Sequence, residues 1–387
     1  MPKKRGRGEG SIRKRADGLW EARVTIGIDP NKKQKRKSIY GKTRDSVQKK
    51  MITLLHDLHQ GQYVEPSHMT MHQWLDMWLQ EYKRYMVKPT TYNNYIARIN
   101  HHIKPHLGDY KLKDLRVDNI QTMVNEMHRK NLSPETIRGV YNIVHAALEQ
   151  ALTNGLIVKN IANKIALPKA EKKAVQVLNI DQQKLFVEAA KNVYMGGLFI
   201  LNLATGLRLG ELLALTWEDV YFEEGILRVS RSLYIAKDHD DTTAKWQKHI
   251  GAPKTESSIR SIPLLPAASD ILKDIKAKQQ AQKAKASVSY ENNGLVFATH
   301  QGRPLDPRNM QKIFASILKE ANITQSMHIH CLRHTFATRG LEQGIELKVM
   351  QELLGHSSIK MTADLYTHVL PDKKIESIMK LKDTIVL

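Results

Sequence analysis

Cysteine is almost absent from this 387-residue chain, which contains only Cys331. A single thiol excludes a disulfide scaffold and a four-cysteine zinc site, and it is typical of a reducing compartment. The chain also lacks an apolar run of about 20 residues, the length that a membrane-spanning helix needs. Its longest uncharged stretch, 192–207, favours a buried core helix, and no apolar signal segment follows the basic N-terminus. We therefore expect a cytoplasmic protein with no membrane partner.

Acidic side chains are also few, because 39 Asp and Glu stand against 60 Lys and Arg, a formal charge of +21. Such an excess indicates a polyanionic partner, and nucleic acid first. Residues 1–60 hold 17 basic and 6 acidic side chains, 61–175 hold 16 and 10, and 176–387 hold 27 and 23. The positive charge is therefore densest at the N-terminus, in a chain long enough for two or three domains.

Residues 11–40 have the pattern of three strands joined by turns. The second strand, 19–28, alternates and should place five apolar side chains on one face, namely Trp20, Ala22, Val24, Ile26 and Ile28. Thr43 is the expected N-cap of a helix that ends near His59. Lysines often blunt an exposed sheet edge, but five cations in the third strand exceed that need and favour DNA contact. The expected DNA-binding residues are Arg13, Lys14, Arg15, Arg23, Lys33, Lys35, Arg36 and Lys37.

Residues 65–166 have the pattern of an all-helical domain. Its first helix has an aromatic face with four-residue spacing, typical of core packing, at Trp74, Trp78 and Tyr82. Further helices are expected at 90–106, 117–130 and 134–154. Ser133 and Pro134 form a typical helix start.

The remaining chain changes from helices to strands and back to helices. The expected organisation is an N-terminal domain of three strands and a helix, an all-α domain, and a mostly α domain with a small antiparallel sheet. Their expected bounds are 1–64, 65–166, a linker at 167–175, 176–372, and an apolar tail at 373–387.

Five short motifs follow one another in the third domain. They are Thr205-Gly206-Leu207-Arg208-Leu209-Gly210-Glu211-Leu212, Pro253-Lys254-Thr255, His330-Cys331-Leu332-Arg333, Leu354-Gly355-His356-Ser357 and Leu365-Tyr366-Thr367. His330 and Arg333 have the spacing of one helix face, and Glu211 stands where it can pair with Arg208. A zinc site is the alternative use of four residues here, His328, His330, Cys331 and His334. We expect no metal, because His330 would have two tasks and a second ligand cluster is missing from the sequence.

The order of these motifs resembles that of the tyrosine recombinase (phage-type integrase) family. The resemblance spans 208–366 and fills all six catalytic positions of the family, with Arg208, Lys254, His330, Arg333, His356 and Tyr366. The N-terminal layout is similar to integrases of Gram-positive phages and conjugative transposons, in which arm-site-binding and core-binding domains precede the catalytic domain. The resemblance implies the tyrosine recombinase fold, a bacterial host, and double-stranded DNA with core and arm attachment sites as partner.

The family roles suit the residue types in this chain. Tyr366 is the implied nucleophile, which forms a 3′-phosphotyrosine bond. Arg208 and Arg333 are implied to clamp the phosphate through planar guanidinium groups. His356 is implied to donate a further hydrogen bond to it. Glu211 is expected to orient Arg208 or its helix rather than to contact the phosphate.

The resemblance also implies two residues that transfer protons. His330 is the implied base for the tyrosine proton, and Lys254 the implied acid for the leaving 5′ oxygen. The scheme needs no cofactor, because the phosphotyrosine conserves the bond energy. The family further implies a homotetramer on DNA, with 373–387 packed on a neighbouring subunit, and an accessory DNA-bending or excisionase protein. The alternative for this apolar tail is to fold back onto its own domain.

Two alternatives to site-specific recombination remain open at this point. A type IB topoisomerase would use the same chemistry and religate the original ends. A DNA-binding protein with vestigial catalytic residues would cut nothing. The arm-binding domain argues against the first alternative, and the intact set of six residues argues against the second.

Overall fold

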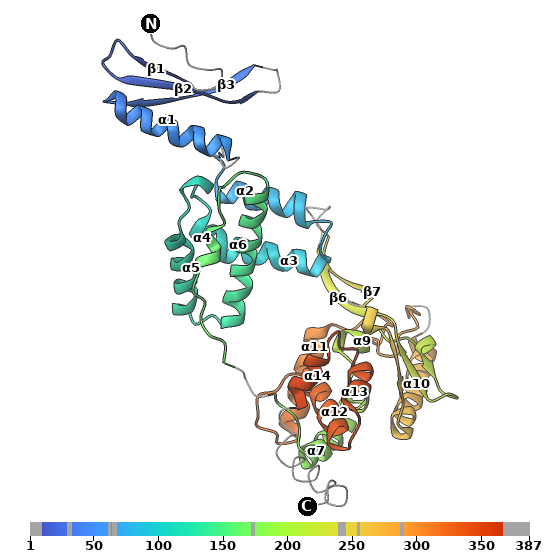
Figure 1. Ribbon diagram of the computed structural model, residues 1–387. Coiled ribbons are helices and arrows are strands. Elements are labelled where there is room, and N and C mark those ends of the chain that lie inside the picture. The colour runs from blue at the N-terminus through green and yellow to red at the C-terminus, as the bar shows by residue number, and fades with distance from the viewer. Residues whose placement is uncertain are drawn as a thin grey trace, which may run out of the picture. The chain divides into compact units, whose positions relative to one another are not determined.

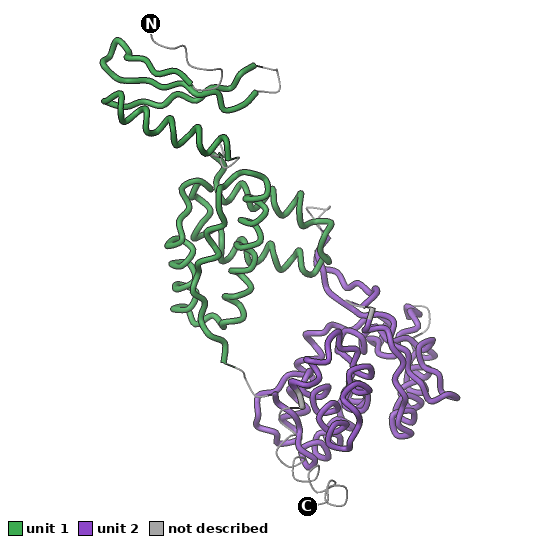
Figure 2. The backbone as a smooth tube through the Cα atoms, in the orientation of Figure 1, with its two compact units in different colours: residues 1–171 green, residues 172–387 purple. Residues whose placement is uncertain are grey.

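The computed structural model describes residues 10–28, 33–60, 63, 68–171, 175–238, 245–253, 256–286 and 290–366. The chain divides into two compact units, residues 1–171 and 172–387 (Figure 2). Among the described residues, every helix is too short or too polar to cross a membrane. Element labels follow Figure 1.

The first unit begins with an antiparallel sheet and a helix, as predicted. These elements are β1 (Ser11–Lys14), β2 (Trp20–Ile28), β3 (Gln34–Gly41) and α1 (Arg44–His59), and the strand order is β1-β2-β3. The Thr43 side chain caps α1 by accepting from the backbone N–H of Ser46. α1 covers one face of the sheet, where Ala22 and Val24 are fully buried (Figure 1). The opposite face is called the open face below.

Ile28 departs from the prediction for β2, because its side chain is 72% exposed. The pairing of β2 with β3 shifts between Thr25 and Gly27, so Ile26 is an extra residue in the ladder. Such a bulge breaks the alternation of side chains. The apolar face predicted for β2 therefore ends at Ile26.

The rest of the first unit is helical, as predicted. Its elements are α2 (Met71–Met77), η1 (Trp78–Lys83), α3 (Pro89–Arg98), η2 (Ile99–Ile103), α4 (Lys104–Leu107), η3 (Leu112–Asp114), α5 (Val117–Arg129), α6 (Pro134–Thr153) and η4 (Ile161–Lys164). Trp74 and Trp78 are fully buried, and Nε1 of Trp74 donates to the Ala147 carbonyl at 2.9 Å. The aromatic face therefore belongs to the core, as predicted. The predicted helix 90–106 contains the π-helical turn η2 just before Pro105, a residue without an N–H for regular helical bonding.

The second unit is mostly helical, with two small antiparallel sheets where one was predicted. The sheets have the orders β4-β5-β8 and β6-β7. Its strands are β4 (Val220–Tyr221), β5 (Ile226–Val229), β6 (Ser232–Lys237), β7 (Trp246–Gly251) and β8 (Arg260–Pro263). Its α-helices are α7 (Ile180–Lys191), α8 (Gly196–Thr205), α9 (Leu209–Leu213), α10 (Pro266–Ala286), α11 (Pro307–Glu320), α12 (His330–Glu342), α13 (Leu347–Leu354) and α14 (Ile359–Tyr366).

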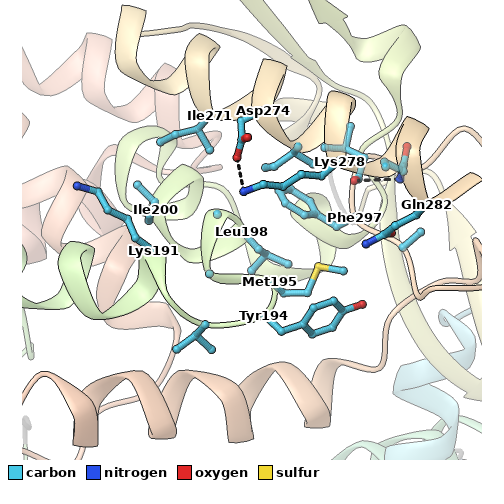
Figure 3. Close-up of a pocket in the computed structure, with 17 residues that line it drawn as sticks. Lys191, Tyr194, Met195, Leu198, Ile200, Ile271, Asp274, Lys278, Gln282 and Phe297 are labelled. Atoms are coloured by element: carbon cyan, nitrogen blue, oxygen red, sulfur yellow. Dashed lines mark hydrogen bonds and ion pairs between the residues drawn. The ribbon is translucent and has the colours of Figure 1, made fainter.

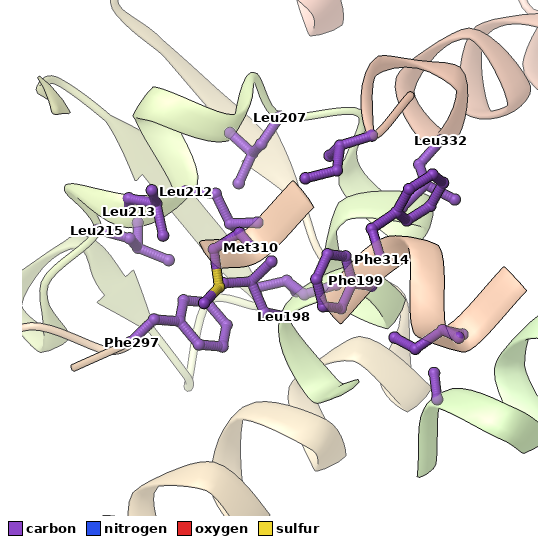
Figure 4. Packing of buried hydrophobic residues seen from close by; sticks show 14 of the residues in the cluster. Leu198, Phe199, Leu207, Leu212, Leu213, Leu215, Phe297, Met310, Phe314 and Leu332 are labelled. Atoms are coloured by element: carbon purple, nitrogen blue, oxygen red, sulfur yellow. The ribbon is translucent and has the colours of Figure 1, made fainter. Parts of the chain in front are cut away.

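The central helix of this unit is α8, which lies within the predicted buried segment 192–207. Leu198 and Phe199 of α8 are fully buried (Figure 4). The ring of Phe199 packs against Phe314 of α11, with centroids 5.9 Å apart. α12 also packs against α8. The core thus fixes the ends of the helices from which the candidate site is built.

Candidate active site

The candidate site begins where two helices end. α8 is followed by Gly206 and α13 by Gly355, and both glycines have a left-handed φ of 62°. A Cβ at Gly206 would lie 2.5 Å from the Phe336 ring, and one at Gly355 would lie 2.9 Å from the Ser257 carbonyl oxygen. Both turns therefore require glycine. The last carbonyls of a helix need partners from outside it, and here arginines supply them.

Arg333 is the central side chain of the site. It lies in α12 and is 1% exposed. Its Nη1 donates to the Gly206 carbonyl at 2.7 Å, and its Nη2 donates to the Leu354 carbonyl at 2.6 Å. Burial, together with the charge of Arg208, lowers the Arg333 pKa to about 9, so the group remains charged at pH 7. One planar guanidinium thus bridges the ends of α8 and α13.

Arg208 lies directly before α9 and faces the same helix ends. Its Nη2 donates to the Gly355 carbonyl at 3.0 Å, and its Nη1 donates to Glu211 Oε1 at 2.8 Å. The Arg208 backbone N–H also donates to Glu211 Oε2, at 3.0 Å. The Arg208 side chain remains 33% exposed. The Arg208–Glu211 contact predicted from the sequence is therefore present.

Arg260 joins this group and was missed by the sequence reasoning. It begins β8, and its side chain is 6% exposed. Its Nη2 donates to Glu211 Oε2 at 2.9 Å, and its Nε donates to the Leu353 carbonyl at 2.6 Å. The available signal was the alternation of the strand, which puts Arg260 on the same side as the buried Ile262. We refer to Arg208, Arg260 and Arg333 as the arginine cluster.

Glu211 is the counter-ion of the arginine cluster, and its side chain is 2% exposed. Burial acts to raise the pKa of this carboxyl group. The charge of Arg260 and the hydrogen bonds from Arg260 and Arg208 outweigh burial, so the Glu211 pKa is lowered. One carboxylate thus faces three guanidinium groups. The described part of the site has an excess of positive charge that a bound anion would offset.

His356 follows Gly355 directly and is 7% exposed. Its Nδ1 lies 3.0 Å from the hydroxyl oxygen of Thr362, a buried residue of α14. Burial, and then the charges of Arg333 and Arg208, lower the His356 pKa to about 3. The ring is therefore neutral at pH 7, with Nε2 as its second hydrogen-bonding atom.

His330 and His334 lie one turn apart on α12, with ring centroids 4.5 Å apart in an edge-to-face arrangement. Burial, and then the charges of His334 and Arg333, lower the His330 pKa to about 4. His330 also keeps exposed surface. The lowered pKa means a neutral imidazole at pH 7, which is the form that accepts a proton.

The zinc alternative finds little support in this geometry. Cys331 is buried, and burial raises the pKa of its thiol to about 12. Within the part of the chain that the structure describes, no three His, Cys, Asp or Glu side chains are grouped as metal ligands.

The structure describes the two remaining predicted catalytic residues less fully. Tyr366 is the last residue of α14, one helical turn after Thr362. α14 packs against both α12 and α13. Lys254 lies outside the described residues, in the connection between β7 and the short helix η6 (Glu256–Ser258). The hydroxyl of Ser258 in η6 lies 3.5 Å from Arg208 Nη1, so the segment after Lys254 reaches the arginine cluster.

A cavity of about 380 Å³ lies elsewhere in the second unit (Figure 3). Leu198, Ile271 and Phe297 are among its apolar lining residues, and Asp274 pairs with Lys278 at its edge, at 2.7 Å. Its lining includes none of the predicted catalytic residues. We do not assign the cavity to the reaction, because a DNA phosphate is reached from the protein surface.

The eight predicted DNA-binding residues do not share one face of the N-terminal sheet. Lys14 pairs across the ladder with Trp20, and Lys37 with Val24, which puts both on the α1 side. The Lys37 ammonium accordingly lies 5.0 Å from the centre of the Tyr63 ring. The open-face positions are those of Arg13, Arg23 and Arg36.

For the other three residues, the regular alternation of the strands does not assign a face, because two flank the strands and one lies beside the bulge. Arg15 follows β1 and lies 5.2 Å from the centre of the Tyr40 ring, an open-face residue. Lys33 precedes β3, and Lys35 pairs with Gly27 next to the bulge. The predicted cations of the strands are therefore divided between the two faces of the sheet, because the period of two sends alternate side chains to opposite faces.

Comparison with known proteins establishes the family. Residues 172–373 match the group described as "Phage integrase family", and residues 70–128 match "Phage integrase, N-terminal SAM-like domain". The chain is 33% identical over 374 residues to the tyrosine recombinase XerC-like protein of Caldanaerobacter subterraneus subsp. tengcongensis, covering 94% of this chain and 95% of that protein. This chain belongs to the phage integrase family of tyrosine recombinases. Enzymes of this family act without a metal ion.

Two solved structures share the fold. One is the Tn1549 transposon integrase in complex with transposon right end DNA, with a TM-score of 0.68 and 22% identity over 81% of this chain and 100% of that one. The other is a lambda integrase tetramer bound to a Holliday junction, with a TM-score of 0.57 and 20% identity over 94% of this chain and 96% of that one.

Proposed function

We propose that this recombinase is the integrase of a mobile genetic element, which cuts and rejoins DNA through a 3′-phosphotyrosine intermediate and a Holliday junction. One observation carries the assignment of its site. Arg208, Arg333 and His356 gather at the ends of α8 and α13, and His356 contacts α14 at Thr362, one turn before Tyr366. Phosphate-binding groups and the proposed nucleophile therefore belong to one packed set of elements.

The arginines are suited to bind the two non-bridging oxygens of a DNA phosphate. A guanidinium has five N–H donors, and the described contacts of Arg333 use two of them on carbonyls. The others remain for the phosphate. Because the guanidinium is fixed before DNA arrives, no rearrangement is needed when charge develops on the phosphate oxygens.

His356 is proposed to add a third donor. When Nδ1 accepts from the Thr362 hydroxyl, the ring proton is on Nε2 and can be donated to the phosphate. The lowered pKa supports the neutral form of the ring. A bound phosphate would in turn raise the pKa of His356, because its negative charge counteracts that of the arginines.

The chemical step is an exchange of two phosphate esters. The Tyr366 oxygen attacks phosphorus and forms a phosphotyrosine bond with the 3′ end, while the bond to the 5′ oxygen breaks. His330 takes the phenol proton, and Lys254 gives a proton to the leaving 5′ oxygen. The reverse reaction with a 5′ hydroxyl from the partner duplex completes strand exchange. It consumes no nucleotide, because the ester bond energy is retained.

The proposed division of labour follows the predicted domains. Residues 1–64 bind arm sites, 65–166 bind the core site, 176–372 hold the chemistry, and 373–387 pack on a neighbouring subunit of a tetramer. The last segment lies outside the described residues. The Tn1549 and lambda integrase structures support assembly on DNA, since one contains transposon end DNA and the other is a tetramer on a Holliday junction. An accessory DNA-bending or excisionase protein is part of the same expectation.

The Tyr366→Phe variant tests the proposal on nicked DNA substrates that trap the covalent intermediate. We expect DNA binding to persist and covalent adducts to disappear. Tyr221→Phe is the matched control, because Tyr221 is an exposed tyrosine of β4 in the same unit. Adducts that survive Tyr366→Phe would refute the nucleophile assignment. Relaxation of supercoiled DNA without paired sites, with no strand exchange between sites, would favour the topoisomerase alternative.

A further inference from the structure

A buried carboxylate lies on the open face of the N-terminal sheet, where exposed polar residues are the rule. Glu21 lies in the middle of β2, and its side chain is 2% exposed. Its cover consists of polar side chains. Arg13 Nε donates to Oε2 at 2.7 Å, and Arg23 Nε and Ser38 Oγ donate to Oε1, each at 3.0 Å. The Tyr40 hydroxyl lies 3.4 Å from the same oxygen.

The two arginines use the same atom to hold this carboxylate. Each contacts Glu21 through Nε, and the side chains of Arg13 and Arg23 are 59% and 44% exposed. Among the described residues, the Nη groups of both arginines have no hydrogen-bond or ion-pair partner. A guanidinium held through Nε is restricted in its rotation, and its Nη edge is directed away from the anchoring carboxylate. The hydrogen bonds from Arg23 and Arg13 lower the Glu21 pKa to about 2, so the anchor stays ionised at working pH.

We propose that Glu21 is a positioning residue that presents Arg13 and Arg23 to guanine bases in the major groove of double-stranded DNA. This inference rests on the proposed function, which gives residues 1–64 an arm site to bind. The two Nη groups of one arginine match the O6 and N7 acceptors of guanine, a bidentate contact that discriminates between bases. Freely rotating lysines or arginines would instead follow the phosphates, which carry no sequence information.

The Glu21→Gln variant separates a positioning role from a purely electrostatic one, because the two roles predict opposite changes in DNA affinity. Glu21→Gln makes the domain more positive by one charge, and this change alone strengthens binding to any DNA. If Glu21 positions the two arginines, the same variant weakens binding to the preferred sequence. The sign of the change therefore separates a positioning role from a purely electrostatic one.

The test uses the full chain and a pool of duplexes with a randomised 20-bp centre, selected by binding and then sequenced. Three variants are selected in parallel: Glu21→Gln, Arg23→Lys and Asp17→Asn. Asp17→Asn is the matched control, because it removes the same charge from an exposed acid. Asp17 forms an ion pair with Arg15 at 3.1 Å and accepts the Leu19 backbone N–H at 3.2 Å, a bond that the asparagine oxygen can also accept. Arg23→Lys keeps the charge and alters the geometry, at a side chain that is 44% exposed.

We expect the natural protein and Asp17→Asn to enrich one guanine-containing motif that Glu21→Gln and Arg23→Lys fail to enrich. Affinity for the enriched duplex should fall roughly tenfold to a hundredfold in Glu21→Gln. Replacing the motif guanines by 7-deazaguanine, which lacks the N7 acceptor, should weaken the natural protein and leave Glu21→Gln nearly unchanged. Unchanged motif enrichment in Glu21→Gln, or tighter binding of the motif duplex, would overturn the proposal.

The same samples separate this inference from the proposed function. Covalent adducts on a nicked core substrate depend on the second unit and should form equally in Glu21→Gln and the natural protein. A missing effect on the motif with normal adducts would refute the role of Glu21 alone. A missing adduct in the natural protein would refute the recombinase proposal and leave the motif result standing.

Discussion

Each of the two units contains a buried glutamate that holds two arginines, and the arginines differ in what else binds them. Glu21 holds Arg13 and Arg23 on the open face, and Glu211 holds Arg208 and Arg260 in the candidate active site. Both carboxylates are 2% exposed. The arginines of the first pair are about half exposed, whereas Arg260 is 6% exposed.

The two groups of arginines also differ in whether they bind backbone carbonyls. The arginine cluster is tied to carbonyls at the ends of α8 and α13, whereas the described contacts of Arg13 and Arg23 are to side chains. Carbonyls at a rigid helix end fix a guanidinium closely, which suits a phosphate whose shape never changes. An exposed guanidinium on one carboxylate can adjust to a base pair. The comparison teaches that one pairing, arginine on buried glutamate, can serve two tasks through different degrees of anchoring.

Arg333→Lys tests the anchoring to carbonyls most severely. A lysine cannot span the Gly206 and Leu354 carbonyls with a planar fork, so we expect cleavage of nicked DNA to fall roughly a hundredfold to a thousandfold. Arg339→Lys on the same helix is the control, because Arg339 contacts Glu342 and the Leu178 carbonyl instead. Equal rates for both variants would show that the carbonyl anchoring is irrelevant to cleavage.

Gly355→Ala tests the turn that presents two of these carbonyls. The substitution must adopt a positive φ and also brings Cβ to 2.9 Å from the Ser257 oxygen. We expect cleavage to fall about tenfold to a hundredfold, with a loss of stability of roughly 1–3 kcal/mol. Gly344→Ala has the same kind of strain, with φ of 87°, and open space around its Cβ. Similar cleavage rates in the two variants would show that the turn at Gly355 does not position groups needed for cleavage.

Arg260→Lys tests whether the missed residue positions Glu211 and, through it, Arg208. We expect the cleavage rate to fall about tenfold at unchanged DNA affinity, since Nε, Nη1 and Nη2 of Arg260 already donate to the Leu353 carbonyl, the Ser258 carbonyl and Glu211. Arg228→Lys on the neighbouring strand β5 is an exposed control. A loss of DNA affinity equal to the loss of rate would instead mean that Arg260 binds DNA.

The histidine titration is the smallest effect and the most local one. Because the folded-state pKa of His356 lies near 3, below its ordinary 6.5, we expect its ring to remain neutral to below pH 5 in NMR spectra of the free protein. The unfolded chain takes up this proton first, so His356 costs stability as pH falls from about 6.5 towards 3. A cognate duplex should raise the pKa. A free-protein midpoint near 6.5 would contradict the buried, cation-flanked site.

Local signals predicted the secondary structure well, because caps and apolar periods depend on neighbouring residues. Thr43 and Ser133 cap helices through contacts three residues away. The prediction for Ile28 was wrong, since the bulge depends on how β2 pairs with the next strand, β3, and the alternation within β2 does not show it. The division of the short strands of the second unit into two sheets was also not predicted, because it depends on which strands pair.

The sequence predicted which residues belong to the candidate site, but it did not predict how they contact one another. Motif order pointed to Arg208, Arg333 and His356, which the structure brings to two helix ends. The contact from Arg333 to Gly206 joins residues 127 positions apart, and no local pattern encodes it. Arg260 stands alone in its strand and belongs to none of the recognised motifs. Its role becomes visible only when Glu211 and the end of α13 are placed beside it.

The most direct test of the central claim is to identify the amino acid that carries the DNA. The natural protein is trapped on a nicked core substrate, digested with nuclease and trypsin, and analysed by mass spectrometry. We predict that the residual nucleotide is on the peptide 361–373, whose only tyrosine is Tyr366. A nucleotide attached to any other peptide would contradict the account.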